Sequence, residues 1–106
     1  MAQALKTADG QLPNAKGTLY AVPASTQAVV KTVSLVNVSA SVVTVNLYVR
    51  PGATSRQIVE KGYSLAPNKG LFIDNTSIIL EAGDLLEGDA SVPSAVDYYV
   101  GLVEFT

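Results

Sequence analysis

Residues 27–50, QAVVKTVSLVNVSASVVTVNLYVR, decide the fold class of this chain. Nine of these twenty-four residues are valine, whose branched side chain packs well on the pleated surface of a β-sheet. One face of the second half carries only aliphatic side chains: Val43, Val45, Leu47 and Val49. This period of two is typical of a strand with one buried face. We therefore predict two consecutive strands, at 27–38 and 41–50.

Further strand signals follow on both sides of this pair, and most end at glycine or proline. The predicted strands are 18–22, 55–60, 63–66, 71–74, 78–81, 85–90 and 95–105. No stretch of ten residues shows the 3.6-residue period of an amphipathic helix. Short strands with frequent turns predict an all-β domain, an antiparallel β-sandwich of the jelly-roll or Ig-like type. The spacing of the strands leaves the topology open.

The two ends of the chain differ in pattern. Residues 1–16 show neither strand nor helix periodicity, and we interpret them as an extended N-terminal arm outside a sandwich domain at 17–106. Leu5 and Leu12 are spaced apolar anchors in this arm, although the segment also fits a loose terminus. The last predicted strand is apolar on both faces, which is typical of a central strand or of a subunit interface.

Composition excludes most catalytic chemistry. The chain has 106 residues, enough for one domain with its own core, and contains neither cysteine nor histidine. Disulfides, zinc–thiolate sites and the usual general base near neutral pH are therefore excluded. Charged residues make up only 15% of the chain and apolar residues 48%, so we expect part of its apolar surface to be covered by another protein. We predict a protein that is not an enzyme and has no cofactor.

Charge is unevenly distributed along the chain. All seven lysines and arginines lie within residues 1–69, whereas residues 70–106 hold seven acidic residues and no basic one. If early and late strands interleave in the fold, these charges mix on the surface. If they do not, the domain is polarised and suited to head-to-tail self-association. We favour the first interpretation.

The acidic segment LEAGDLLEGDA, residues 80–90, is the strongest candidate for chemistry. Its acidic residues are Glu81, Asp84, Glu87 and Asp89. Two carboxylates could act on a glycosidic bond, and several could bind calcium. The segment lacks the D-x-[DN]-x-[DN]-G pattern of a calcium loop, and we interpret it as a solvated acidic loop. We therefore assign no catalytic, cofactor-binding or metal-binding residue.

Other binding motifs are weak. A pI of about 4.8 argues against nucleic-acid binding, and no apolar stretch is long enough to cross a membrane. We expect a soluble protein made in a cytoplasm. Two matches to the N-glycosylation pattern, Asn37-Val38-Ser39 and Asn75-Thr76-Ser77, are interpreted as chance because no secretion signal precedes them.

Three motifs give a resemblance to a known group of proteins. They are Leu19-Tyr20-Ala21-Val22-Pro23, the strand from Val33 to Ser39 with its final Asn-x-Ser, and the turn from Leu80 to Leu86. Across residues 17–106 the chain resembles small virion proteins of tailed bacteriophages, in particular capsid decoration (cement) proteins. These motifs concern packing and turns, so they imply a fold and an assembly role and no reactive site.

The resemblance implies a homo-oligomer, commonly a trimer, on the capsid surface of the virion, with the major capsid protein as its partner. We expect the arm to contact the capsid through Leu5 and Leu12. We expect Tyr98, Tyr99 and Phe105 of the last strand to lie between protomers. The function predicted is the stabilisation of a capsid by bridging neighbouring subunits.

Two alternative functions remain open. One is a head–tail connector or tail accessory protein, which would use similar contacts at another place in the virion. The other is a carbohydrate-binding β-sandwich module, which needs an exposed aromatic platform. Tyr48, Tyr63 and Tyr99 are the candidates for that platform, and the chain has no tryptophan.

Overall fold

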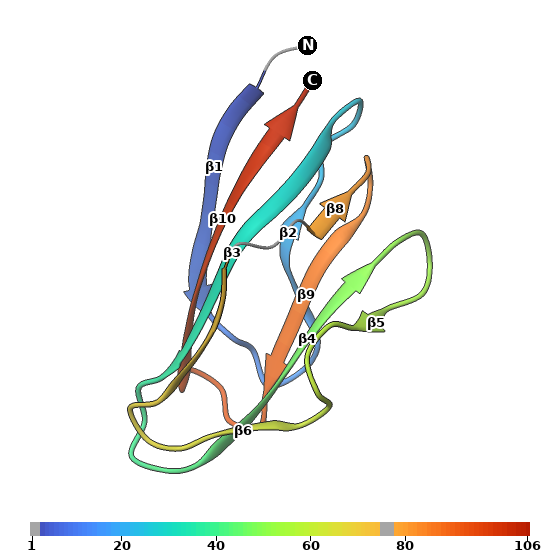
Figure 1. Cartoon of the computed structure of the whole chain (residues 1–106). Helices are drawn as coiled ribbons and strands as arrows, with labels where there is room; N and C mark the ends of the chain where they lie inside the picture. Colours follow the sequence, from blue (N-terminus) through green and yellow to red (C-terminus); the bar gives the residue numbers. More distant parts are fainter. Residues whose placement is uncertain (1–2, 75–77) are drawn as a thin grey trace.

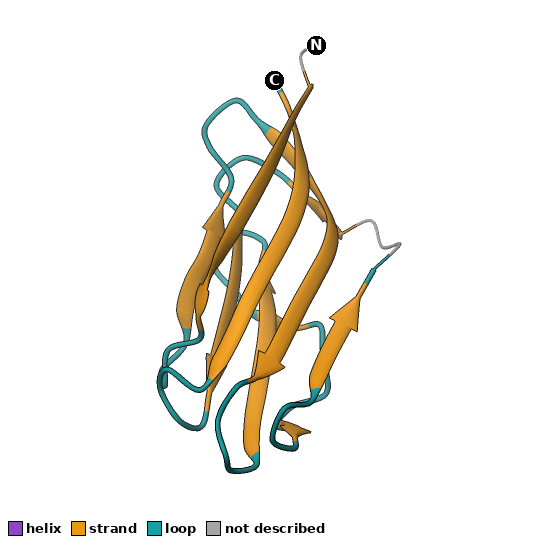
Figure 2. Ribbon diagram, turned by 90° about the vertical axis from the view of Figure 1, so that its left-hand side faces the viewer, coloured by secondary structure: helices purple, strands orange, loops and turns teal. Residues whose placement is uncertain are grey.

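The computed structural model describes residues 3–74 and 78–106 as two antiparallel β-sheets packed face to face (Figures 1 and 2). Sheet A contains β1 (Gln3–Gln11), β10 (Val96–Phe105), β3 (Gln27–Asn37), β7 (Gly70–Ile73) and β8 (Ile78–Leu80). Sheet B contains β2 (Gly17–Ala21), β9 (Leu85–Ala90), β4 (Val43–Arg50), β5 (Arg56–Gln57) and β6 (Tyr63–Leu65). Within the described ranges there is no helix. The predicted antiparallel β-sandwich is confirmed.

The strands pair as one long antiparallel ribbon folded back on itself. β1 pairs with β10, β2 with β9, β3 with β7 and β8, and β4 with β5 and β6. Two further pairings, β10 with β3 and β9 with β4, join the ribbon into the two sheets. This nested order is that of a jelly roll. An Ig-like sandwich keeps its first two strands in one sheet, whereas here β1 and β2 lie in different sheets.

The extended N-terminal arm is not confirmed. Residues Gln3–Gln11 form β1, an edge strand that pairs with β10 along its whole length, from Gln3 opposite Phe105 to Gln11 opposite Asp97. All residues of β1 except Ala8 are exposed, so no apolar alternation marks this strand in the sequence. Backbone hydrogen bonds to a neighbouring strand hold such an edge irrespective of its side chains.

The core lies between the two sheets and consists of aliphatic side chains. The largest of its fully buried apolar residues are Leu12, Leu35, Leu47, Leu80 and Leu86. The alternation predicted for β4 is confirmed, because Val43, Val45 and Leu47 are at most 1% exposed. Burial of each such side chain is worth about 1.5–3 kcal/mol relative to leaving it in water. The valine-rich segment thus supplies one wall of the core from β3 and the other from β4.

Early and late strands interleave in both sheets. β10 lies between β1 and β3 in sheet A, and β9 lies between β2 and β4 in sheet B. The acidic second part of the chain therefore lies among strands of the basic first part. This agrees with the interpretation that the charges mix on the surface.

Two of the motifs behind the family resemblance meet at one end of the sandwich. The Val22 amide donates to the Asp84 carbonyl at 3.0 Å, and the Gly83 amide donates to the Val22 carbonyl at 3.1 Å. Gly83 has a φ of 86°, a conformation that glycine adopts without strain. Nearby, the Tyr20 hydroxyl of sheet B donates to the buried Glu104 carboxylate of sheet A at 2.5 Å. The two motifs therefore extend the pairing of β2 with β9 within sheet B, and the Tyr20 hydroxyl adds one bond to sheet A.

Asn37, at the end of β3, is a buried hydrogen-bonding centre with no exposed surface. Its side-chain amide donates to the carbonyls of Ser41 and Leu65, at 2.8 and 2.9 Å. Its side-chain oxygen accepts from the amide and the hydroxyl of Ser39, at 2.9 and 2.7 Å. All four side-chain hydrogen bonds available to an asparagine are made, and they fix the crossing of the chain from sheet A to sheet B.

Substitution of Asn37 tests this role. We expect Asn37→Ala to lower the free energy of unfolding by about 2–4 kcal/mol, because buried carbonyls and the Ser39 groups lose their partner. Urea denaturation followed by circular dichroism measures the change. Asn14→Ala, at an exposed asparagine, is the matched control and should change stability by less than about 0.5 kcal/mol. Equal effects of the two substitutions would contradict the role given to Asn37.

Candidate functional site

The outer face of sheet A carries a row of apolar side chains that crosses four strands. The register places Leu5 of β1 opposite Val103 of β10, Val103 opposite Val29 of β3, and Val29 opposite Ile79 of β8. We call these four residues the apolar row. Leu5 is 86% exposed and Ile79 68% exposed, whereas the two valines between them are partly buried by their neighbours.

A second line of side chains adds two exposed aromatic residues to this face. Phe72 of β7 lies opposite Ser34 of β3, which in turn lies opposite Tyr99 of β10. Phe72 is 67% exposed and Tyr99 50% exposed. Exposed apolar side chains gathered on one face, in contrast to scattered ones, mark a surface that contacts another molecule. The outer face of sheet A is therefore the candidate functional site.

A hollow of about 290 Å³ interrupts this face beside the apolar row. Gly101, which has no side chain, lines this hollow together with Leu5, Val103 and Lys31. The pairing of β10 with β3 shifts register at this point, since Gly101 lies opposite Thr32 but Leu102 lies opposite Val30. Lys31 is thus the extra residue of a β-bulge at the edge of the hollow.

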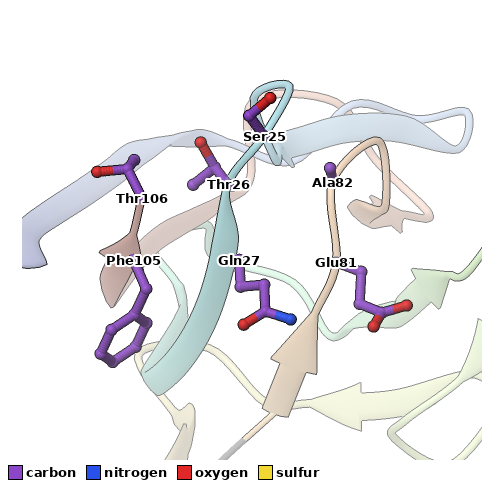
Figure 3. A pocket seen from close by; sticks show the side chains of 7 residues that line it. All are labelled: Ser25, Thr26, Gln27, Glu81, Ala82, Phe105 and Thr106. Carbon is purple, nitrogen blue, oxygen red and sulfur yellow. The ribbon is translucent and has the colours of Figure 1, made fainter. Parts of the chain in front are cut away.

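A second, larger hollow of about 390 Å³ lies at one end of the sandwich (Figure 3). Phe105 of β10, Gln27 of β3 and Glu81 after β8 come to it from three neighbouring strands. Ser25 and Thr26 also line this hollow. Its lining combines one aromatic ring, one carboxylate and one amide. Phe105, Gln27 and Glu81 each lie two residues along their strand from a member of the apolar row. They lie on the opposite side of that row from Gly101.

Sheet B differs from sheet A because polar side chains linked by hydrogen bonds cover its outer face. The Asp89 carboxylate accepts from the Asn46 amide and the Tyr48 hydroxyl, both at 2.8 Å. The Glu87 carboxylate accepts from the Ser55 hydroxyl at 2.6 Å, and Glu87 is only 4% exposed. The interpretation of residues 80–90 as a solvated acidic loop is therefore wrong for Glu87 and Asp89, which lie in β9.

The predicted contact residues fall into two groups. Leu5, Tyr99 and Phe105 lie together on the outer face of sheet A, although they were assigned to two separate interfaces. Leu12 is 1% exposed and belongs to the core, so its side chain is not available to dock on a neighbour. Tyr98 points to the other side of β10 and packs against the core. Sequence reasoning missed Val29, Ile79 and Phe72, because only the strand register brings them beside Leu5 and Tyr99.

The remaining sequence motifs do not form a site. Tyr48 and Tyr63 lie in sheet B and Tyr99 in sheet A, so the three tyrosines do not form one aromatic platform. Asn37 is buried, so the folded domain does not present this glycosylation match. The match at Asn75 lies outside the described residues. Carbohydrate binding by a tyrosine platform therefore loses its geometric basis.

Comparison with protein-family models and with curated proteins finds no match for this chain. Among residues 3–74 and 78–106, no group of three acidic, histidine or cysteine side chains is placed to hold a metal ion. The same residues include no helix long and apolar enough to cross a membrane. The site is thus described by its own geometry, which is an apolar face with two hollows.

The two leucines of the N-terminal segment should respond differently to the same substitution. We expect Leu12→Ala to lower the free energy of unfolding by about 2–5 kcal/mol, because it leaves a cavity in the core. We expect Leu5→Ala, at an exposed position, to change it by less than about 0.5 kcal/mol. Urea denaturation of both variants measures the difference. A small effect of Leu12→Ala would contradict the position of β1 and Leu12 in the sandwich.

The hydrogen-bonded tyrosines predict a loss of stability at alkaline pH. Burial and the hydrogen bond to Asp89 raise the pKa of Tyr48 from 10.0 to about 12, and burial and Glu104 raise the pKa of Tyr20 further. The folded state therefore retains phenolic protons that the unfolded chain loses above about pH 10. This contribution to stability is complete below pH 10 and disappears as the pH rises through about 12.

Thermal unfolding at about pH 8 and about pH 11 measures this effect. We expect the wild-type midpoint to fall between the two conditions, and the midpoint of Tyr48→Phe to fall less, because phenylalanine has no proton to lose. Equal decreases in the two proteins would show that Tyr48 does not contribute.

Proposed function

We propose that this chain is a structural virion protein that binds the outer surface of a phage capsid and stabilises it by bridging neighbouring subunits. The observation that carries the proposal is the exposed apolar face of sheet A, on which Leu5, Phe72, Ile79 and Tyr99 are all at least half exposed. A face of this kind is costly in water unless another protein covers it. The absence of cysteine and histidine from the sequence fits a role in contact and not in catalysis.

Two further observations support an assembly role. The nested strand order is that of a jelly roll, a fold used by many viral capsid proteins and also by lectins and cupins. Two of the motifs that resemble decoration proteins meet at Val22 and Asp84, and Tyr20 of the first motif bonds across to Glu104 of the other sheet. Because a fold hosts several functions, the jelly roll by itself supports the proposal only by analogy.

The proposed mechanism is mechanical. A rigid sandwich bound across a boundary between capsid subunits buries apolar surface on both, so that separating the subunits also requires breaking these contacts. A specific interface buries about 1,600 Å² in total, and many copies on one shell act together. The domain contributes stiffness through its aliphatic core and its cross-sheet hydrogen bonds.

Among the alternative functions, a head–tail connector or tail accessory protein would use the same kind of surface. Electron cryo-microscopy of the particle separates them, because density over the whole shell supports decoration and density at the neck or tail supports the alternative. The carbohydrate-binding alternative is disfavoured, since the candidate tyrosines are divided between the two sheets.

Co-sedimentation with shells assembled from the major capsid protein of the same virion tests the proposal. We expect Leu5→Asp to lower the apparent affinity at least about tenfold, because a carboxylate would have to be buried on the apolar face. Val42→Asp, at a 60% exposed valine in the loop after β3, is the matched control and should bind like the wild type.

Wild-type protein that does not sediment with such shells would overturn the proposed capsid function. Equal binding by Leu5→Asp and Val42→Asp would show that the outer face of sheet A is not used.

A further inference from the structure

We propose that the free edge of β1 pairs with β1 of a second copy of this chain, antiparallel, across a two-fold axis that passes through Thr7 and stands perpendicular to the sheet. This contact uses the backbone edge of sheet A and leaves its outer face uncovered. It goes beyond the proposed capsid function and does not compete with it for the same surface. It differs from the trimer implied by the family resemblance, because a two-fold axis relates two copies.

β1 is the longest free edge of the two sheets within the described residues. It has nine residues and pairs on one side only, with β10 (Figure 1). The other edges are short, because β7 and β8 have four and three residues, β5 and β6 two and three, and β2 five. Proteins commonly keep edge strands short or cover them, since a long free edge offers its N–H and C=O groups to another strand. β1 is therefore the edge at which a further strand would add.

The hydrogen bonds to β10 show which backbone groups of β1 are free. The Leu12 amide donates to the Val96 carbonyl at 2.9 Å, so these two residues form a hydrogen-bonded pair. Such pairs alternate with non-bonded pairs along an antiparallel ladder. The even-numbered residues of β1 therefore bond to β10, and the odd-numbered ones point their N–H and C=O groups to the open edge. These odd-numbered residues are Gln3, Leu5, Thr7, Asp9 and Gln11.

The space beside β1 is open on both faces of the strand. Leu5 lies on the outer face of sheet A, so its neighbours Ala4 and Lys6 point to the side on which sheet B lies. Both are nevertheless exposed, which means that sheet B does not extend beneath this part of β1. The edge of sheet A thus projects beyond sheet B, and this leaves room for a strand next to β1.

The side chains of β1 select the centre of the pairing. Thr7 is the middle residue of β1, so an axis at Thr7 pairs the whole strand, whereas an axis at Leu5 or Ala8 leaves one end unpaired. An axis at Lys6 or Asp9 places like charges directly opposite each other, which is destabilising. With the axis at Thr7, Lys6 lies opposite Ala8 and Asp9 opposite Leu5 of the other copy. No like charges are then directly opposite.

Backbone hydrogen bonds supply most of the affinity of such a contact, as in other cases of strand addition. The free groups of β1 would form about ten hydrogen bonds, two in each bonded pair, and a typical protein interface contains about ten. The buried area is small for a permanent interface, so we expect a dissociation constant of about 10–100 μM. A second copy is the favoured partner because the two-fold axis supplies a strand of the same length, with its free groups in the matching positions.

The dimer has a consequence for the proposed function. Neighbouring strands of one sheet share its two faces, so the outer faces of both copies of sheet A lie on the same side of the dimer. Each dimer would present two exposed apolar faces to one surface. Two linked contacts bind more firmly than one, and they connect the two subunits that they touch. This is the geometry that bridging requires.

Hydrogen exchange of backbone amides, followed by nuclear magnetic resonance at several protein concentrations, tests the edge directly. We expect the amides of Leu5, Thr7 and Asp9 to exchange quickly in dilute protein and to become protected as the dimer forms, because they point to the open edge. The amides of Lys6 and Ala8 bond to β10 and are the internal control. They should be protected at all concentrations.

Charge substitutions at Thr7 test the position of the axis. Thr7→Glu and Thr7→Lys should each weaken dimerisation at least about tenfold, because each new charge faces its own counterpart. An equimolar mixture of the two variants should recover the dimer, since Glu then faces Lys. The matched controls are Thr54→Glu and Thr54→Lys, at an exposed threonine in the loop between β4 and β5, which should dimerise like the wild type. Sedimentation equilibrium measures all of these, and circular dichroism verifies the fold.

Single-cysteine variants provide a covalent test, because the natural chain has no cysteine. Opposite residues of a hydrogen-bonded antiparallel pair have Cα atoms about 5.5 Å apart, a distance that a disulfide spans. We expect Thr7→Cys to form a disulfide-linked dimer on mild oxidation. Thr54→Cys is the control and should remain largely monomeric under the same conditions.

Wild-type protein that remains monomeric at about 0.5 mM would overturn the dimer, as would a mixture of the two Thr7 charge variants that does not recover. Protection of Leu5, Thr7 and Asp9 only when capsid shells are present would also overturn it, because the edge would then bind a strand of the capsid protein. If the wild type is monomeric but binds shells, the proposed function stands and the dimer fails. If the dimer forms but binds no shell, the dimer stands and the capsid function fails.

Discussion

The antiparallel pairing of β3 with β10 is the interaction on which the rest of this structure depends. β1 is attached only to β10 within sheet A, and β7 and β8 are attached only to β3. The pair also divides its side chains between two uses, with Val33, Leu35 and Val100 on the core side and Val29 and Val103 on the outer side. Because its two strands lie far apart in the chain, the pairing needs a large loop to close before its contacts form. The core and the outer face of sheet A therefore depend on the same pair of strands.

Most of the fold was predictable from the sequence because burial is encoded locally as alternation. The aliphatic face of β4 shows this alternation, and the turn after β4 is marked by Pro51 and Gly52. β1 was not predictable, since its side chains are exposed and backbone bonds to β10 hold it. Asn37 was equally hidden. One of its partners is the Leu65 carbonyl, 28 positions away, and a partner that distant leaves no local pattern. In the sequence its Asn-x-Ser motif resembles a glycosylation match, whereas in the structure Asn37 organises the crossing of the chain between the sheets.

The apolar outer face of sheet A was predictable only in part, for a different reason. Tyr99 and Phe105 could be proposed from the doubly apolar pattern of the last strand. Their neighbours Val29 and Ile79 depend on the register between strands, which no single segment contains. The bulge at Lys31 also changes which residues of β3 face outward on its two sides. A surface formed by one residue from each of four strands is thus a property of the pairing and leaves only a faint trace in the sequence.

The first and last strands also determine where the two ends of the described chain lie. Gln3 is paired directly with Phe105, and both ends leave the sandwich at the same end of the molecule (Figure 1). Opposite residues in an antiparallel pair are only about 5 Å apart, so a linker of a few residues would close the backbone into a ring. Such a ring, reopened at an exposed turn, keeps the same strand pairs in a permuted sequence order. The pairing of the strands is therefore independent of the point at which such a ring is opened.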